Sequence, residues 1–272
     1  RARPALRRSV GESRQMSDGP PPGSPPVARR SELRLRVLSA VLLVPAALLV
    51  TTLGGTWFAL GAGACALILL REWILIVRAQ HETLASAIGY ASVVGAAVAA
   101  AAGEIEAGFA LLLVSSAGLA LLGSVQRHKQ TLWLAAGIVY AGSSGAVLIA
   151  LRDGSAGLAV IVFLFGVVWA TDIIAYFVGR RVGGPKLWVR VSPKKTWSGA
   201  LGGFAAAVAV GWIGFLLTGR ASPGVWLAFA AVLSVFSQVG DLFESALKRH
   251  FGVKDSGHII PGHGGVMDRL DG

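Results

Sequence analysis

Long apolar stretches are the feature that most restricts what this chain can fold into. Several of them, between residues 36 and 248, reach the roughly 17–25 residues that a helix needs to cross a bilayer. Only 14% of the residues are charged, whereas soluble domains usually carry about 25%. The sequence therefore predicts an all-α fold, a polytopic bundle of transmembrane helices.

Apolar runs and the turn residues between them divide the chain into about eight helices. The segment 1–35 is rich in Arg, Pro, Ser and Gly, which predicts a disordered basic N-terminal segment, with Met16 as an alternative start. We expect N-terminal transmembrane helices over 36–151 and a C-terminal catalytic transmembrane region with cytoplasmic loops over 152–272. The helices are expected at 36–53, 56–77, 87–102, 107–123, 132–151, 157–178, 198–218 and 224–248.

Lysine and arginine residues predict which side of the membrane each loop faces. Eight helices place both termini on one side, and cytoplasmic loops are enriched in basic residues. With a cytoplasmic N-terminus, fourteen of the 25 basic residues fall in the inner loops and the C-terminal segment, and only two fall in the outer loops. The net charge of +11 is then explained by topology and by anionic lipid or phosphate ligands, so no nucleic-acid partner is expected.

Ionisable residues at the end of the last predicted helix are the first functional candidates. Asp241, Glu244, Ser245 and Lys248 are spaced i, i+3, i+4 and i+7, so they share one helical face. Asp241 lies roughly 10 Å deeper than Lys248. Ionisable groups within membrane helices are functional candidates, and the alternative is an Asp–Lys pair that only fixes packing. Asp172, near the cytoplasmic end of the 157–178 helix, is a weaker candidate of the same kind.

Two cytoplasmic loops carry the other candidates. In 192–199, hydroxyl and ammonium groups precede a helix N-terminus, which suits an anion site, although lysines beside a membrane end are also topology signals. In 261–265, glycines predict a tight turn whose amides a phosphate can approach. Asp268 follows this turn, and its carboxylate and that of Asp241 are ligands that Mg²⁺ prefers.

Fifteen residues near the C-terminus also follow one fixed pattern. The order is Ser-x-x-Lys-Arg, four residues, Lys-Asp-x-Gly, a Pro-Gly-His-Gly-Gly turn and Asp-Arg-x-Asp. In this pattern the chain resembles the integral-membrane phosphatidate cytidylyltransferase (CDP-diacylglycerol synthase) family. The similarity covers roughly residues 34–272, and its specific part is 169–272. The matching residues are Ser245, Lys248, Arg249, Lys254, Asp255, Ser256, Gly257, Pro261, Gly262, His263, Gly264, Gly265, Asp268, Arg269 and Asp271.

The resemblance implies transfer of cytidylyl from CTP to phosphatidic acid, giving CDP-diacylglycerol and pyrophosphate in phospholipid biosynthesis. It implies that Asp241 and Asp268 hold Mg²⁺ and a second metal ion. The expected catalytic residues are Asp241, Asp268, Lys248, Arg249, Asp255 and Arg269. The expected substrate-binding residues are Ser192, Lys194, Lys195, Thr196, Ser245, Lys254, His263, Gly264, Gly265 and Asp172.

The expected partners are CTP, phosphatidic acid and membrane lipids, and the resemblance also suggests a homodimer. It implies a bacterial-type inner (plasma) membrane, with the active site facing the cytoplasm. Members of the family usually continue past the signature into one more membrane helix. Because this sequence stops at Gly272, we expect the final family helix to be missing from it.

Three other functions are compatible with parts of the sequence. An enzyme of the same superfamily acting on an isoprenoid lipid would have nearly the same site residues. A CDP-alcohol phosphotransferase would share the acidic spacing of Asp268 and Asp271, but its Asp-Gly-x-x-Ala-Arg run is absent. An ion-coupled transporter would also bury Asp172 and Asp241, but transporters often show two matching repeats, and the polar residues here crowd into the C-terminal half.

Overall fold

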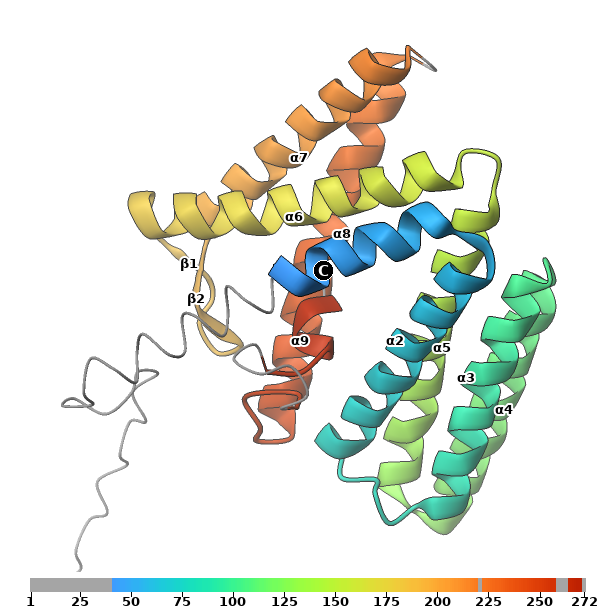
Figure 1. Cartoon of the computed structure of the whole chain (residues 1–272). Helices are drawn as coiled ribbons and strands as arrows, with labels where there is room; N and C mark the ends of the chain where they lie inside the picture. Colours follow the sequence, from blue (N-terminus) through green and yellow to red (C-terminus); the bar gives the residue numbers. More distant parts are fainter. Residues whose placement is uncertain (1–40, 220–221, 258–263, 271–272) are drawn as a thin grey trace, which may run out of the picture.

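The structure is a computed structural model that describes residues 41–219, 222–257 and 264–270 (Figure 1). The predicted N-terminal segment 1–35 lies outside this range. In chain order the elements are the helix Val41–Leu53, α2 Gly55–Ile76, α3 Thr83–Ala101, α4 Ile105–Gln126, α5 Lys129–Asp153, α6 Gly157–Val182, β1 Lys186–Trp188, β2 Ser192–Thr196, α7 Trp197–Thr218, α8 Pro223–His250 and α9 Met267–Leu270.

Seven of the described helices, α2 to α8, are long and apolar enough to cross a membrane. The prediction of an all-α, polytopic membrane protein is therefore confirmed. The predicted bounds of these seven helices agree with the structure within four residues. The first predicted helix, 36–53, is seen over Val41–Leu53, because residues 36–40 lie outside the described range.

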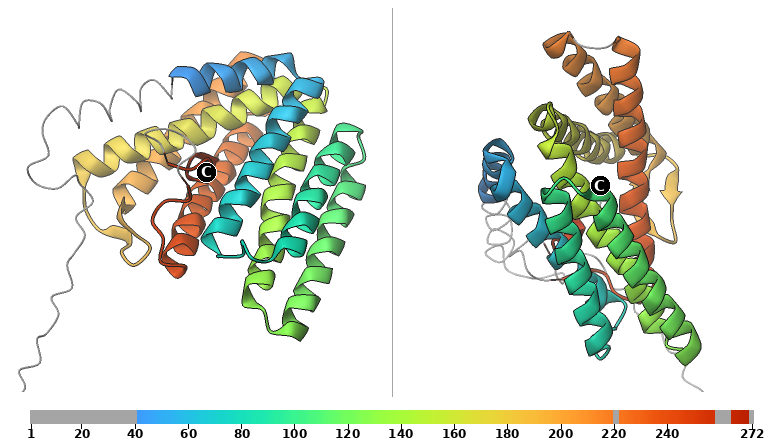
Figure 2. Two further views of the ribbon diagram at one scale, coloured as in Figure 1. Left: turned by 60° about the horizontal axis from the view of Figure 1, so that its bottom comes forward. Right: turned by 90° about the vertical axis from the view of Figure 1, so that its right-hand side faces the viewer.

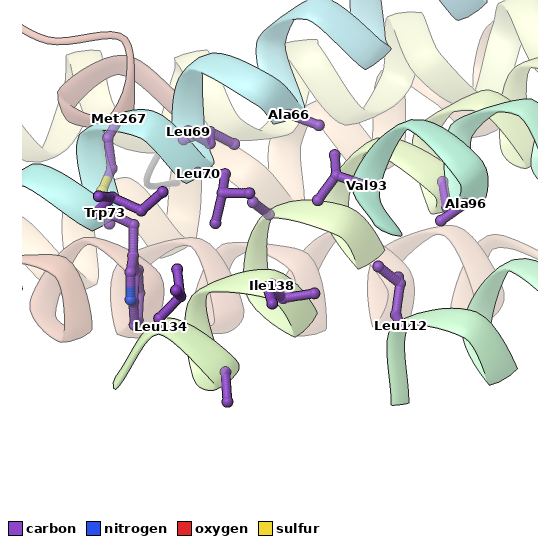
Figure 3. Close-up of a cluster of buried hydrophobic side chains, with 14 of the residues drawn as sticks. Ala66, Leu69, Leu70, Trp73, Val93, Ala96, Leu112, Leu134, Ile138 and Met267 are labelled. Carbon is purple, nitrogen blue, oxygen red and sulfur yellow. The ribbon is translucent and has the colours of Figure 1, made fainter. Parts of the chain in front are cut away.

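Helices α2 to α5 pack side by side and contain most of the buried apolar side chains (Figures 1 and 3). Small residues allow this close approach. A Cβ atom added at Gly137 would lie 2.3 Å from the ring of Trp73, and one added at Gly108 would lie 3.1 Å from the carbonyl oxygen of Ala96. The Trp73 indole N–H donates to the carbonyl oxygen of Trp133 at 2.8 Å. This group of helices contains the larger of the two hydrophobic clusters of the described residues.

Helices α6, α7 and α8 form a second group beside the first (Figure 2). The buried residues of α7 repeat every four positions, as Gly199, Gly203, Ala207 and Gly211. This stripe lets backbones come close, as in other membrane helix pairs. A Cβ atom at Gly203 would lie 2.7 Å from the carbonyl oxygen of Thr171 on α6.

The segment between α6 and α7 was expected to be a loop, but it contains an antiparallel hairpin of β1 and β2. Lys186 pairs with Thr196, and Trp188 pairs with Ser192. Thr196 then caps α7, because its hydroxyl oxygen accepts the backbone N–H of Gly199 at 3.2 Å. The hairpin therefore holds the predicted anion-binding residues in a defined register.

The C-terminal half of α8 connects the two groups. The ring of Phe243 lies 6.2 Å from that of Trp73 on α2 and 5.9 Å from that of Tyr140 on α5. Helix α9 lies against α2, and its Met267 is fully buried beside Leu69 and Trp73 (Figure 3). The candidate site is assembled here, between α2, α8, α9 and the hairpin.

Candidate active site

Two carboxylate–lysine pairs lie two helical turns apart along α8. The first joins Asp241 of α8 to Lys195 of β2, and both side chains are about one-third exposed. It connects the hairpin to the helix. Because these charges are close to solvent, a ligand can reach both of them.

The second pair centres on Lys248 in the last turn of α8. Its ammonium group lies 2.5 Å from Asp268 Oδ1 and 3.1 Å from Glu244 Oε1. Glu244 is fully buried, and the side chains of Lys248 and Asp268 are only 13% exposed. Partly buried charges are retained in folded proteins when they are paired and hydrogen-bonded in this way.

Asp268 also accepts two backbone hydrogen bonds. The N–H groups of Gly265 and Ser256 donate to its Oδ2 at 3.0 and 3.2 Å. Burial by itself raises the pKa of the Asp268 carboxyl, but the bonds from Lys248 and Gly265 outweigh this effect and hold the pKa below its ordinary value. Asp268 is therefore ionised at neutral pH.

Glu72 of α2 is a fourth carboxylate at this site, and the sequence reasoning did not find it. It is fully buried and accepts hydrogen bonds from the Ser256 hydroxyl at 2.9 Å and from the N–H groups of Val266 and Met267 at 2.9 and 2.7 Å. The available signal was an acidic residue inside an apolar, membrane-length helix. The residue types and spacing around Glu72 do not indicate which distant groups contact it.

The glycines of the expected turn lie close to these carboxylates. Gly264 has φ +85°, and a Cβ atom there would lie 2.9 Å from Asp268 Oδ2. A Cβ atom at Gly265 would lie 1.9 Å from the Ser256 hydroxyl oxygen. In this structure the two glycines leave room for the Asp268 carboxylate and the Ser256 hydroxyl to lie against the backbone. The N–H of Gly265 donates to Asp268.

Residues 34–272 match the cytidylyltransferase family. The chain belongs to this family. It is 44% identical to a phosphatidate cytidylyltransferase of Brucella abortus over 247 residues, which cover 89% of each chain. It is 33% identical to a protein of the same name from Staphylococcus haemolyticus over 88% of this chain and 94% of that one. With the Bacillus subtilis protein of that name it shares 49% identity over 116 residues, 42% of this chain and 43% of that one. The expected family and nucleotidyltransferase class are confirmed.

The other predicted site residues of this cytidylyltransferase differ in exposure. Ser192 and Ser245 are partly buried, and Thr196 is buried with its hydroxyl bonded to Gly199. Asp172 is exposed on α6. His263 lies outside the described residues. The other predicted charged residues are exposed: Lys194, Arg249, Lys254, Asp255 and Arg269.

The cytidylyltransferase family generally uses a divalent metal ion. Within the described ranges, no three His, Cys, Asp or Glu side chains come together as a preformed cluster. Mg²⁺ is one divalent ion that is usually held by only one or two carboxylates, together with substrate phosphates and water. Asp241 fits best, because it is partly exposed and bonded to a single lysine. Asp268 can contribute through the second lone pair of Oδ1, which already accepts a hydrogen bond from Lys248, since Oδ2 accepts two N–H groups.

Proposed function

We propose that this protein transfers cytidylyl from CTP to phosphatidic acid and releases pyrophosphate. The observation that carries the proposal is the arrangement of two lysine–carboxylate pairs along α8, Asp241 with Lys195 and Asp268 with Lys248. Carboxylates that can hold a cation, next to ammonium groups that can bind phosphate, suit a reaction between two polyanions. The names of the relatives supply the substrates, and they favour phosphatidate over an isoprenoid lipid or a transported ion.

The reaction needs no nucleophile from the protein. A phosphate oxygen of phosphatidic acid attacks the α-phosphorus of CTP and forms a new P–O–P linkage. The bond from the α-phosphorus to the bridging oxygen of the β-phosphate breaks, and pyrophosphate leaves with that electron pair. Phosphoryl-type transfer of this kind depends mainly on positioning and on charge stabilisation.

In this proposal, Asp241 and Asp268 hold Mg²⁺, and a second metal ion binds with it. The bound ions neutralise charge on the phosphates. Lys195 exchanges its bond to Asp241 for a substrate phosphate, and Lys248 keeps Asp268 oriented. Flanking residues on the hairpin, the end of α8 and the C-terminal segment bind the triphosphate and the lipid headgroup: Ser192, Lys194, Ser245, Arg249, Lys254, Asp255, His263 and Arg269. Thr196 supports them by capping α7, and Asp172 contributes from α6.

We also propose that the protein lies in the inner (plasma) membrane of a bacterium with this site facing the cytoplasm. Two features support this: bacterial relatives, and the concentration of basic residues on the loops at the α8 end that carries Lys248. CTP is available on that side. A homodimer is proposed only by resemblance, and sedimentation of the detergent-solubilised protein would test it.

The experiment that tests the function supplies purified full-length chain with CTP, Mg²⁺ and phosphatidic acid and follows CDP-diacylglycerol and pyrophosphate. We expect both products in equal amounts, no products with EDTA, and no CDP-lipid when an isoprenoid phosphate replaces phosphatidic acid. Turnover with the isoprenoid alone would identify the other lipid class. A folded protein that forms neither product would contradict cytidylyl transfer.

A further inference from the structure

We infer that Glu72 is a positioning residue, whose buried carboxylate holds the C-terminal active-site segment so that Asp268 is presented correctly for metal binding. The inference rests on the function proposed above. It concerns α2, which lies in the half of the chain that carries none of the residues expected to be catalytic. It also explains why a buried acidic side chain occupies the last two turns of a membrane-length helix, α2 Gly55–Ile76.

Among the described residues, the donors to Glu72 all lie in the segment that follows α8. Its donors are the Ser256 hydroxyl and the backbone N–H groups of Val266 and Met267, 184 to 195 positions later in the sequence. A carboxylate with no exposed surface is very costly unless such donors satisfy it. The C-terminal segment and Glu72 therefore stabilise each other's position.

The donors of Glu72 and those of Asp268 alternate along the same two stretches of chain. Ser256 donates its hydroxyl hydrogen to Glu72 and its backbone N–H to Asp268. In the second stretch, the N–H of Gly265 donates to Asp268, whereas that of Val266 donates to Glu72. A shift of the segment away from Glu72 would therefore also displace the groups that orient Asp268.

The space around Glu72 is closely fitted to this carboxylate. A Cβ atom added at Gly257 would lie 2.8 Å from Glu72 Oε1, and one at Gly265 would lie 2.5 Å from Oε2. Met267 adds an apolar anchor, since its side chain is fully buried against the α2 face that carries Leu69 (Figure 3). One polar and one apolar contact thus fix the same turn.

Glu72→Gln separates a positioning role from simple packing, because the volume is kept. Oε1 accepts from Val266, and Oε2 accepts from both Met267 and Ser256. A glutamine has only one acceptor oxygen, so in either orientation of its amide at least one backbone N–H faces an NH₂ group. The turn would loosen while Met267 keeps it attached to α2.

The test uses the full chain in detergent as wild type, Glu72→Gln, Ser256→Ala and the control Glu104→Gln, which changes an exposed glutamate before α4. For Glu72→Gln we expect kcat to fall about 10–100-fold and the Mg²⁺ concentration for half-maximal activity to rise about tenfold, the range seen when the partners of metal ligands are changed. The KM for phosphatidic acid should change less than about twofold. Ser256→Ala should also lower kcat and raise the Mg²⁺ requirement, but by less than Glu72→Gln, because residue 256 keeps its backbone N–H.

Hydrogen exchange in metal-free protein provides a readout independent of turnover. In Glu72→Gln, the amides of Ser256, Gly265, Val266 and Met267 should exchange faster, while those of α3 and α4 stay unchanged. An unaltered Mg²⁺ requirement with unaltered exchange would overturn the inference. A smaller yield of folded Glu72→Gln protein with a normal kcat per folded molecule would also overturn it, because Glu72 would then contribute only to packing. If the wild type makes no CDP-diacylglycerol, the proposed function fails, and the exchange of these amides still decides the role of Glu72.

Discussion

The two aspartates on which the proposed chemistry rests have different surroundings. The side chain of Asp241 is 31% exposed and bonded to Lys195, whereas that of Asp268 is 13% exposed and bonded to Lys248 and two backbone N–H groups. Removing charge from Asp241 costs the fold little, because water can replace the lost partner. Removing it from Asp268 leaves the ammonium group of Lys248, which is only 13% exposed, with Glu244 as its remaining carboxylate, and weakens the turn.

Asp241→Asn and Asp268→Asn should therefore both reduce turnover by at least about 100-fold but differ in stability. We expect the melting temperature in detergent to stay near that of the wild type for Asp241→Asn and to fall clearly for Asp268→Asn. CDP-diacylglycerol formation and thermal unfolding check the two effects, with the exposed Asp153→Asn as control. Substantial activity in either aspartate variant would remove that residue from the metal site.

Acid should destabilise the turn through Asp268. Its pKa is lower in the folded protein than the ordinary value of about 3.9. The stabilisation is thus fully present above about pH 4 and is lost as the pH falls through the lower folded pKa. In EDTA, the melting temperature of the wild type should drop in this acid range, and that of Asp268→Asn should drop less. Equal acid sensitivity of the two proteins would contradict this assignment.

At the scale of elements, α7 is held against α6 by its stripe of small residues. Gly199, Gly203 and Ala207 are buried, and the first two lie against backbone atoms of α6. The hairpin ends where α7 begins, because Thr196 both completes β2 and caps α7. The position of Lys195 beside Asp241 therefore depends on the contact between α6 and α7.

Gly203→Ala should separate α6 from α7, because the added Cβ atom would lie 2.7 Å from the carbonyl oxygen of Thr171. We expect a loss of about 1–3 kcal/mol in the free energy of unfolding and a lower kcat. Gly118→Ala in α4 is the matched control, since nothing lies within 4 Å of its added Cβ atom. That variant should be neutral or more stable by up to about 1 kcal/mol. Equal behaviour of the two variants would show that the contact is loose.

Helices could be predicted from the sequence because their signals are local: apolar length, and glycine or proline between runs. The face of α8 with Asp241 and Lys248 followed from helical spacing in the same way. The hairpin could not be predicted, since the strand that includes Pro193 and Lys194 depends on pairing with β1 rather than on its own propensity. Glu72 was missed for a related reason, because its role depends on donors nearly 200 positions away.

At the scale of the whole molecule, α8 connects the two helix groups, because it packs against members of both. It contacts α2 and α5 through Phe243 and carries Asp241 and Lys248 beside the hairpin and α9. The predicted division at residues 151 and 152 remains a prediction about sequence regions. The site itself draws Glu72 from the first region and the lysines from the second.

The proposed topology predicts which loops can be labelled from outside the cell. In a Cys65→Ser background, a cysteine at Ser155 between α5 and α6 should react with a membrane-impermeant maleimide in intact cells. A cysteine at Arg127 between α4 and α5 should react only after the membrane is opened. The reverse pattern would place the candidate site on the outer side and contradict the proposed orientation.

The long sequence separation between Glu72 and its donors has a consequence for biosynthesis. Ribosomes add about 5–20 residues per second, so α2 is made roughly 10–40 s before Val266 and Met267 exist. During that interval Glu72 lacks the donors that later satisfy it. The contact between α2 and the C-terminal segment therefore forms late, after both helix groups have been made.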